Sequence, residues 1–292
     1  MSTSTEHPET DFDLGAAPMR VGRVRLKVRD LNSVSGFYQD VLRLVLVGQS
    51  AEHIVLGVPG RPLLELVGDP GFSPLDHREA GLFHTAFLLP DRASLARWLG
   101  FVTQRRVRLI GASDHRVSEA IYLADPEGNG IEVYADRPVA DWRSADGQLD
   151  MPSDPLDLQG LLAAAGDGAW TSMPAGSVIG HVHLQVGDTA TAERFYHDIL
   201  GFEVTCRYPG ASFFGAGGYH HQLAANTWNS RSAGPRPDRM AGLDGLELVI
   251  RNAAARGAIE KRAREAGLQH QPGGNGTLLC DPWGTAITLV SG

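Results

Sequence analysis

Two histidines and one glutamate, His84, His181 and Glu132, are the residues of this chain best suited to hold a metal ion. Both histidines stand in strand-like stretches, and Glu132 stands between Ile131 and Val133. A carboxylate in such an apolar strand is costly to bury unless it is paired or metal-bound. Two imidazoles and one carboxylate form the facial triad that suits iron(II), with manganese(II) as the alternative. The sequence therefore predicts an iron(II) site whose open coordination positions carry the chemistry.

An internal repeat relates the stretch around His181 to an earlier part of the chain. Residues 179–186 (IGHVHLQV) align with residues 21–28 (VGRVRLKV), and a Phe-Tyr pair at 195–196 aligns with one at 37–38. Both alignments share one offset, since 179 − 21 and 195 − 37 each give 158. A register without gaps over a strand and a helix indicates an internal duplication. His181 in the later copy corresponds to Arg23 in the earlier one.

A second pair of repeats carries the other two candidates. The stretch 125–134 (DPEGNGIEVY) is echoed by 281–290 (DPWGTAITLV), so the chain contains four units. The equivalent first-strand position holds, in order, Arg23, His84, His181 and Gly245, and the last-strand position of the even units holds Glu132 and Thr288. A single strand histidine is more often an ordinary core or surface residue. The coincidence of three metal-capable groups with equivalent repeat positions favours a metal site.

These residues must be positioned by strands, because each unit reads as a strand, a helix and three further strands. In the first unit, apolar alternation over 21–28 predicts the strand, and apolar residues at helical spacing over 34–42 predict the helix. One unit cannot bury both its helix and its sheet face, so units must pair around a cavity that the first strands face. The predicted fold class is α+β, with four βαβββ modules forming two paired, cup-shaped, β-barrel-like domains.

The expected domain organisation follows the repeats. Residues 1–18, which are polar and acidic, are expected to form a disordered tail. The first half spans 19–138, with modules at 19–70 and 79–138, and the second half spans 178–292, with modules at 178–230 and 240–292. Residues 139–177, rich in Asp, Pro, Gly and Ala, read as a connector with one short helix candidate.

Composition excludes several classes of partner. The chain has 292 residues with 26 basic and 34 acidic side chains, a net charge of −8, which argues against a nucleic-acid or anionic-membrane partner. No apolar run is long enough to span a bilayer, and the N-terminus is unlike a signal peptide. The two cysteines, Cys206 and Cys280, lie in strand-like runs and are expected to be buried thiols rather than a disulfide. A cytoplasmic location is therefore the default expectation.

Four longer motifs resemble the vicinal oxygen chelate superfamily, and most closely its catechol 2,3-dioxygenase subfamily. They are residues 81–90 (GLFHTAFLLP), 111–138 (from GASDH to DRP), 180–186 (GHVHLQV) and 216–228 (AGGYHHQLAANTW). The resemblance implies paired βαβββ modules and an extradiol dioxygenase that opens a catechol-type diol with O2 at a non-haem Fe(II). A small aromatic diol and O2 are then the expected partners.

The chain departs from the usual layout of such dioxygenases, in which the last two modules supply all three ligands. Its fourth unit has Gly245 and Thr288 at the ligand positions, and its first unit has Arg23. A crossed pairing reconciles this, with unit two closing against unit three and unit one against unit four. Pairing across the subunits of a homo-oligomer satisfies the same geometry and stays open at this point. The cup of units one and four is expected to be structural, with Arg23 binding an anion or pairing with an acid such as Glu247.

The resemblance also implies acid/base histidines around the metal. Strand alternation puts His183 on the same face as His181, where it would act on the diol or on oxygen; the alternative is a buried, hydrogen-bonded core residue. His115, in a predicted loop, is a second acid/base candidate, with a solvated loop histidine as the alternative. In the run Tyr219-His220-His221, only one of the adjacent histidines can face the cavity. His221 is the favoured candidate, because extradiol enzymes keep a histidine beside the metal ligands near the equivalent strand. Tyr219 is included with it as a candidate catalytic residue.

Two other functions remain alternatives. A glyoxalase-like metal-dependent lyase or isomerase would use nickel or zinc in a shell richer in carboxylates, whereas Glu132 is the only carboxylate at a ligand position. A non-enzymatic small-molecule-binding protein needs no triad, so it would leave His84, His181 and Glu132 unexplained. Loss of metal and turnover in a Glu132→Ala variant would separate an iron dioxygenase from such a binding protein.

Overall fold

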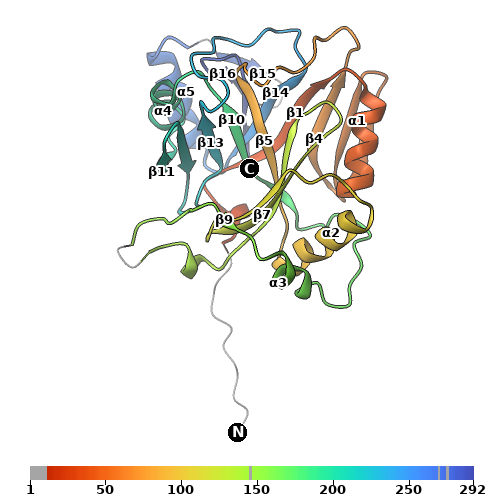
Figure 1. The fold of residues 1–292 in the computed structure, drawn as a ribbon. Coiled ribbons are helices and arrows are strands. Elements are labelled where there is room, and N and C mark those ends of the chain that lie inside the picture. The colour runs from red at the N-terminus through yellow and green to blue at the C-terminus, as the bar shows by residue number, and fades with distance from the viewer. Residues whose placement is uncertain (1–11, 145–146, 269, 274–275) are drawn as a thin grey trace.

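The computed structural model describes residues 12–144, 147–268, 270–273 and 276–292, which fold as two curved sheets with helices on their outer sides (Figure 1). Within these residues, the first sheet has eight strands in the order β15-β16-β17-β14-β1-β4-β3-β2. The second has nine, in the order β11-β12-β13-β10-β5-β8-β7-β6-β9. This confirms the α+β class with repeated modules that form cup-shaped sheets.

The strands of the first sheet are β1 (Met19–Val28), β2 (Val45–Gln49), β3 (His53–Val58), β4 (Arg61–Gly68), β14 (Gly242–Ile250), β15 (His270–Gly273), β16 (Gly276–Cys280) and β17 (Ala286–Ser291). Those of the second are β5 (Gly81–Leu88), β6 (Gly111–Asp114), β7 (Ser118–Ala124), β8 (Gly130–Asp136), β9 (Asp154–Pro155), β10 (Val178–Gln185), β11 (Glu203–Tyr208), β12 (Ala211–Gly215) and β13 (Leu223–Asn226). The helices are α1 (Leu31–Phe37), α2 (Arg92–Gln104), α3 (Leu158–Ala163), α4 (Thr189–Glu193) and α5 (Ala253–Glu265). Short helical turns are η1 (Leu14–Ala16), η2 (Tyr38–Leu42), η3 (Val139–Asp141) and η4 (Arg194–Ile199).

The sheets combine units from opposite halves of the chain. Antiparallel pairing joins β1 of unit one to β14 of unit four, and β5 of unit two to β10 of unit three. Figure 1 shows β5 and β10 running side by side through the middle of the molecule. The crossed pairing is thus present within a single chain, and a second subunit is not needed to bring units two and three together.

Helices and turns tie the units in the other combination. Asp30 caps α1 by accepting from Ser33 N, and Asp188 caps α4 by accepting from Thr191 N. Each helix continues into a π-helical turn, and the tyrosine of each turn reaches the Asp-Pro turn of the following unit. Tyr38 Oη lies 3.4 Å from Asp125 Oδ2, whereas Tyr196 Oη lies 2.7 Å from Asp281 Oδ2. Units one and two, and units three and four, are therefore linked outside the sheets.

The expected tail is partly ordered. Residues 1–11 of that tail lie outside the described residues, but residues 12–18 differ from the prediction because they pack against the second sheet. Leu14 is buried, and the ring centroid of Phe12 lies 5.8 Å from that of Trp142 and 5.0 Å from that of Tyr219. These contacts to residues far along the chain supply the apolar burial that orders the segment.

The expected connector is also built into the second sheet. Its short strand β9 pairs with β6, and α3 packs beside α2. The two cysteines are unpaired thiols, but Cys280 is exposed rather than buried, because it faces outward at the end of β16. Among the described residues, no helix is long and apolar enough to cross a membrane.

Candidate metal centre

The central strands of the second sheet bring His84, His181 and Glu132 together. His84 lies on β5 and His181 on β10, and these strands are neighbours in which His183 is opposite His84. Glu132 lies on β8, which runs parallel to β5 and places Glu132 beside Ala86. Since side chains alternate across a sheet, this register directs the three side chains to one concave face.

The three ligand atoms converge closely. Glu132 Oε2 lies 2.9 Å from His84 Nε2 and 3.2 Å from His181 Nε2, and the two Nε2 atoms are 3.3 Å apart. Metal bonds of about 2.1 Å at right angles would separate three facial ligand atoms by about 3 Å. All three residues are buried, and within the described part of the chain they form the one group of His, Cys, Asp and Glu with metal-binding spacing. The donor set and its spacing therefore fit a divalent metal.

The electrostatics of Glu132 and His181 favour the forms that bind metal. Burial alone would raise the pKa of Glu132, but His181 and His84 beside it bring the pKa well below its usual range. Burial lowers the pKa of His181, an effect that the neighbouring Glu132 only partly offsets. An ionised carboxylate beside neutral imidazoles is the state that coordination requires.

His183 lies next to the three, as alternation predicts. Its ring centroid is 5.0 Å from that of His84, and its Nε2 is 3.0 Å from Asn226 Nδ2. Burial, with further contributions from His84 and His181, lowers the pKa of His183 well below its usual range. The rings of Phe83 and Trp228 flank it at 4.9 and 5.5 Å and form an aromatic wall. Trp228 is half exposed, so this wall is not core packing alone.

Tyr122 belongs to the site, although the sequence reasoning did not single it out. It lies opposite Glu132 across the β7–β8 pair, and its hydroxyl lies 2.7 Å from His115 Nε2. Burial and then the charge of Glu132 raise the pKa of Tyr122 well above its usual value, and the same carboxylate accepts a hydrogen bond from it. His115 Nδ1 lies 2.7 Å from Pro152 O, so the connector holds this histidine over the site. Alternation along 118–123 was the available signal for Tyr122.

The Tyr219-His220-His221 run divides between the site and the base of the cup. The His221 ring lies 4.2 Å from that of His181, whereas His220 is turned toward Asp136. Tyr219 is not brought to the three metal-capable side chains. Among the described residues its hydroxyl bonds to Tyr134 and Asp136, at 2.8 and 3.3 Å.

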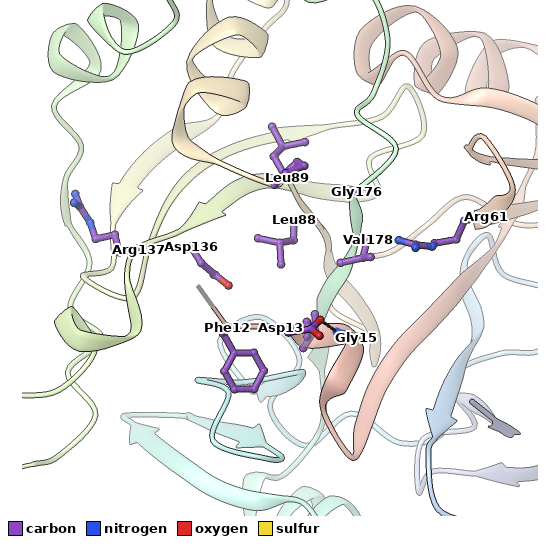
Figure 2. Close-up of a pocket in the computed structure, with 12 residues that line it drawn as sticks. Phe12, Asp13, Gly15, Arg61, Leu88, Leu89, Asp136, Arg137, Gly176 and Val178 are labelled. Carbon is purple, nitrogen blue, oxygen red and sulfur yellow. Dashed lines mark hydrogen bonds between the residues drawn. The ribbon is translucent and has the colours of Figure 1, made fainter. Parts of the chain in front are cut away.

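A cavity of about 280 Å³ lies beyond this base, between residues 12–15 and the ends of β5, β8 and β10. Figure 2 shows the carboxylate of Asp136 directed toward the space between Leu88 and Phe12. Leu88 and Asp136 each lie four residues further along their strands than His84 and Glu132. The cavity is therefore a different space from the candidate metal centre. Asp136, which lines the cavity, lies on the same strand as Glu132.

Among the described residues, the first sheet has no equivalent group of metal-capable side chains. Arg23, at the position of His181, lies 2.6 Å from Glu247 Oε1 and 3.4 Å from Glu65 Oε2. A side chain at Gly245, the position of His84, would meet Ala286 O at 2.5 Å from its Cβ. Arg23 thus pairs with acids, including the predicted Glu247, and there is no room for a second imidazole.

Comparisons with known proteins agree with this geometry. Residues 20–133 and 178–288 match the model of the Glyoxalase/Bleomycin resistance protein/Dioxygenase superfamily. A catechol-2,3-dioxygenase of Bacillus subtilis (strain 168) is 39% identical over 276 residues, covering 92% of this chain and 96% of that protein. Glyoxalase I from Zea mays shares the fold at a TM-score of 0.56 and 15% identity, covering 94% of this chain and 92% of its own. The CppA protein of Streptococcus pneumoniae TIGR4 also shares the fold, at a TM-score of 0.58 and 12% identity. The match covers 94% of this chain and 99% of that protein.

Proposed function

Because the chain belongs to the Glyoxalase/Bleomycin resistance protein/Dioxygenase superfamily, we propose that it is an extradiol dioxygenase. It opens a catechol-type aromatic diol with O2, using Fe(II) held by His84, His181 and Glu132. The observation that carries this is the convergence of three ligand atoms within 3.3 Å of one another. The 39% identity to a catechol-2,3-dioxygenase over most of both chains supports the same reaction.

Iron(II) bound by these residues would supply Lewis acidity toward the diol oxygens and open positions where the diol and O2 meet. The other side chains of the site bind and orient the substrate. Phe83 and Trp228, whose ring centroids are 5.4 Å apart, offer faces to an aromatic ring. The aromatic wall also excludes water, which strengthens the polar contacts inside the cup.

Proton handling falls to the histidines around the triad. His183 and His221 are buried with lowered pKa values, because burial penalises their charged forms. Because Asn226 donates to His183 Nε2, His221 is the one of the two that can accept a proton from a diol hydroxyl. Tyr122 and His115 hold Glu132 from the opposite side of the cup. The site can therefore deprotonate the diol and keep its carboxylate ligand in place.

The test is product analysis with catechol. The protein, purified without oxygen and supplied with Fe(II), is mixed with catechol and ¹⁸O2, and the product is followed by absorbance and mass spectrometry. The proposal predicts a yellow semialdehyde-type product that carries both labelled atoms. Absence of that product, together with isomerisation of the hemithioacetal of methylglyoxal and glutathione, would instead assign a glyoxalase-like lyase.

A further inference from the structure

A series of hydrogen-bonded side chains runs from the part-buried Asp136 through His220 to His221. His220 Nε2 lies 2.9 Å from Asp136 Oδ1, and His220 Nδ1 lies 2.8 Å from His221 Nδ1. His220 is 1% exposed and His221 7%. One end of this series lines the cavity shown in Figure 2, and the other end packs against His181.

Asp136, the acceptor at one end of this series, sets the direction of the hydrogen bonds along it. Asp136 Oδ1 also accepts from Tyr219 Oη at 3.3 Å, so this one oxygen is the acceptor of both contacts. His220 must therefore donate from Nε2. The Nδ1···Nδ1 contact has one donor and one acceptor, and in the single-N–H form of His220 its Nδ1 accepts while His221 Nδ1 donates. The lone pair of His221 is then on Nε2.

Among the described residues, the Nε2 atom of His221 has no hydrogen-bond partner, and it is accessible to solvent. Its ring lies 4.2 Å from that of His181 and 5.1 Å from that of Phe213. We propose that Asp136 and His220 are positioning residues that hold His221 in its Nδ1–H form and present the Nε2 lone pair beside the candidate metal centre. In the proposed dioxygenase, on which this consequence rests, that lone pair accepts a hydrogen bond from a diol hydroxyl.

His183 is held in the same Nδ1–H form, but its Nε2 already has a partner. Trp228 N donates to Asn226 Oδ1 at 3.1 Å, which orients the Asn226 amide so that its Nδ2 faces His183 Nε2 at 3.0 Å. His183 Nε2 is therefore an acceptor, and its proton is on Nδ1. Of the two histidines, His221 is therefore the one whose Nε2 lone pair is free, because Asn226 occupies that of His183.

Nitrogen NMR of the metal-free full chain, labelled with ¹⁵N-histidine, tests the assignment without turnover. The ¹⁵N shifts and ring-proton couplings of a neutral histidine distinguish Nδ1–H from Nε2–H. The proposal predicts Nδ1–H for His221 and Nε2–H for His220. An Nε2–H signal for His221, or a doubly protonated His220 that donates to it, would overturn the proposal.

An Asp136→Leu variant removes the acceptor and keeps the side-chain size. The Nε2–H form of His221 should then appear, and kcat with catechol should fall about 10-fold or more while KM changes less. Tyr219→Phe is the matched control, since it removes the other hydrogen bond to Asp136 and should leave the His221 tautomer unchanged. An unchanged tautomer in Asp136→Leu contradicts the positioning role. If Asp136→Leu does not fold, the wild-type spectrum still decides the question, and absent dioxygenase activity would refute the proposed function while leaving the tautomer assignment readable.

Discussion

Glu132 is a buried carboxylate whose described partners all belong to the candidate metal centre. Its carboxylate is buried and faces two imidazole nitrogens at 2.9 and 3.2 Å. Glu132→Gln keeps the shape and removes the charge that a divalent metal needs, so iron affinity should fall at least about 100-fold. Metal titration by calorimetry under nitrogen measures this. Glu247→Gln, which alters a carboxylate paired with Arg23 in the other sheet, should keep wild-type affinity; equal losses in both variants would argue against the triad.

Tyr122 connects His115 to the candidate ligand Glu132, so its hydroxyl should matter for turnover more than for folding. Tyr122→Phe removes the 2.7 Å contact with His115 and the hydrogen bond to Glu132. Partners of this kind around metal ligands contribute about 10- to 100-fold to activity or affinity, and we expect kcat with catechol to fall by that range. Steady-state kinetics at matched iron content measures it. An unchanged kcat in this variant would contradict a role of the Tyr122 hydroxyl in turnover.

Some of these residues could be read from the sequence and others could not. His84, His181 and Glu132 stood at equivalent positions of a repeat, so their proximity was predictable. Tyr122 was equally accessible through strand alternation. Tyr219 was grouped with the site only because it adjoins His220 and His221, and a turn at 217–219 directs it to the base of the cup instead.

The same tyrosine–aspartate hydrogen bond occurs after both repeated helices, at two different distances. Tyr196 Oη is 2.7 Å from Asp281, whereas Tyr38 Oη is 3.4 Å from Asp125. Removing a hydrogen bond to a buried carboxylate costs about 1.5–3 kcal/mol, so Tyr196→Phe should lower the free energy of unfolding by that amount and Tyr38→Phe by less. Chemical denaturation followed by circular dichroism measures both variants.

The loss in Tyr196→Phe should also depend on pH. Burial raises the pKa of Asp281, and the Tyr196 hydroxyl, which favours the charged form, lowers it only in part. The hydroxyl therefore stabilises the protein only where Asp281 is ionised in the folded state. The difference between wild type and variant should be full at neutral pH and shrink as the pH falls through the raised pKa of Asp281. A difference that grows toward acid pH would contradict this reading.

Segments outside the repeats were predicted least well. The strands and helices of the repeats follow from apolar periodicity, because each buries one face against its own unit. Residues 12–18 and the connector have weak local patterns, and their order depends on contacts such as Phe12 with Trp142 and Tyr219, which are far away in sequence. No local rule predicts burial that distant partners provide.

The crossed arrangement has a consequence for the chain as a whole. Units two and three share the three candidate ligands, so a metal bound by them would join the two halves of the polypeptide. A metal at about 100-fold excess over its dissociation constant should stabilise the fold by about 2.7 kcal/mol. Thermal unfolding under nitrogen, with and without iron(II), should show this as a higher Tm. His181→Arg, which copies Arg23 and can pair with Glu132, should fold but show no iron-dependent shift; a preserved shift would place the metal elsewhere.

The crossed pairing itself was predictable only by an indirect argument. Local patterns identify four units but do not say which units share a sheet. The ligand positions decided it, because units one and four lack the metal-capable residues. The structure adds why the second cup cannot serve as a site, since Gly245 leaves no space for a side chain and Arg23 fills the centre with ion pairs.

Metal content and oxygen consumption of the same anaerobic preparation test the central proposal most directly. The protein is purified without oxygen, its metals are quantified, and oxygen uptake is recorded immediately after catechol is added. We expect about one iron per chain at the triad, with one O2 consumed for each catechol opened and a yellow product. Bound zinc or nickel in an iron-replete preparation, with no oxygen uptake after Fe(II) is supplied, would contradict the dioxygenase assignment.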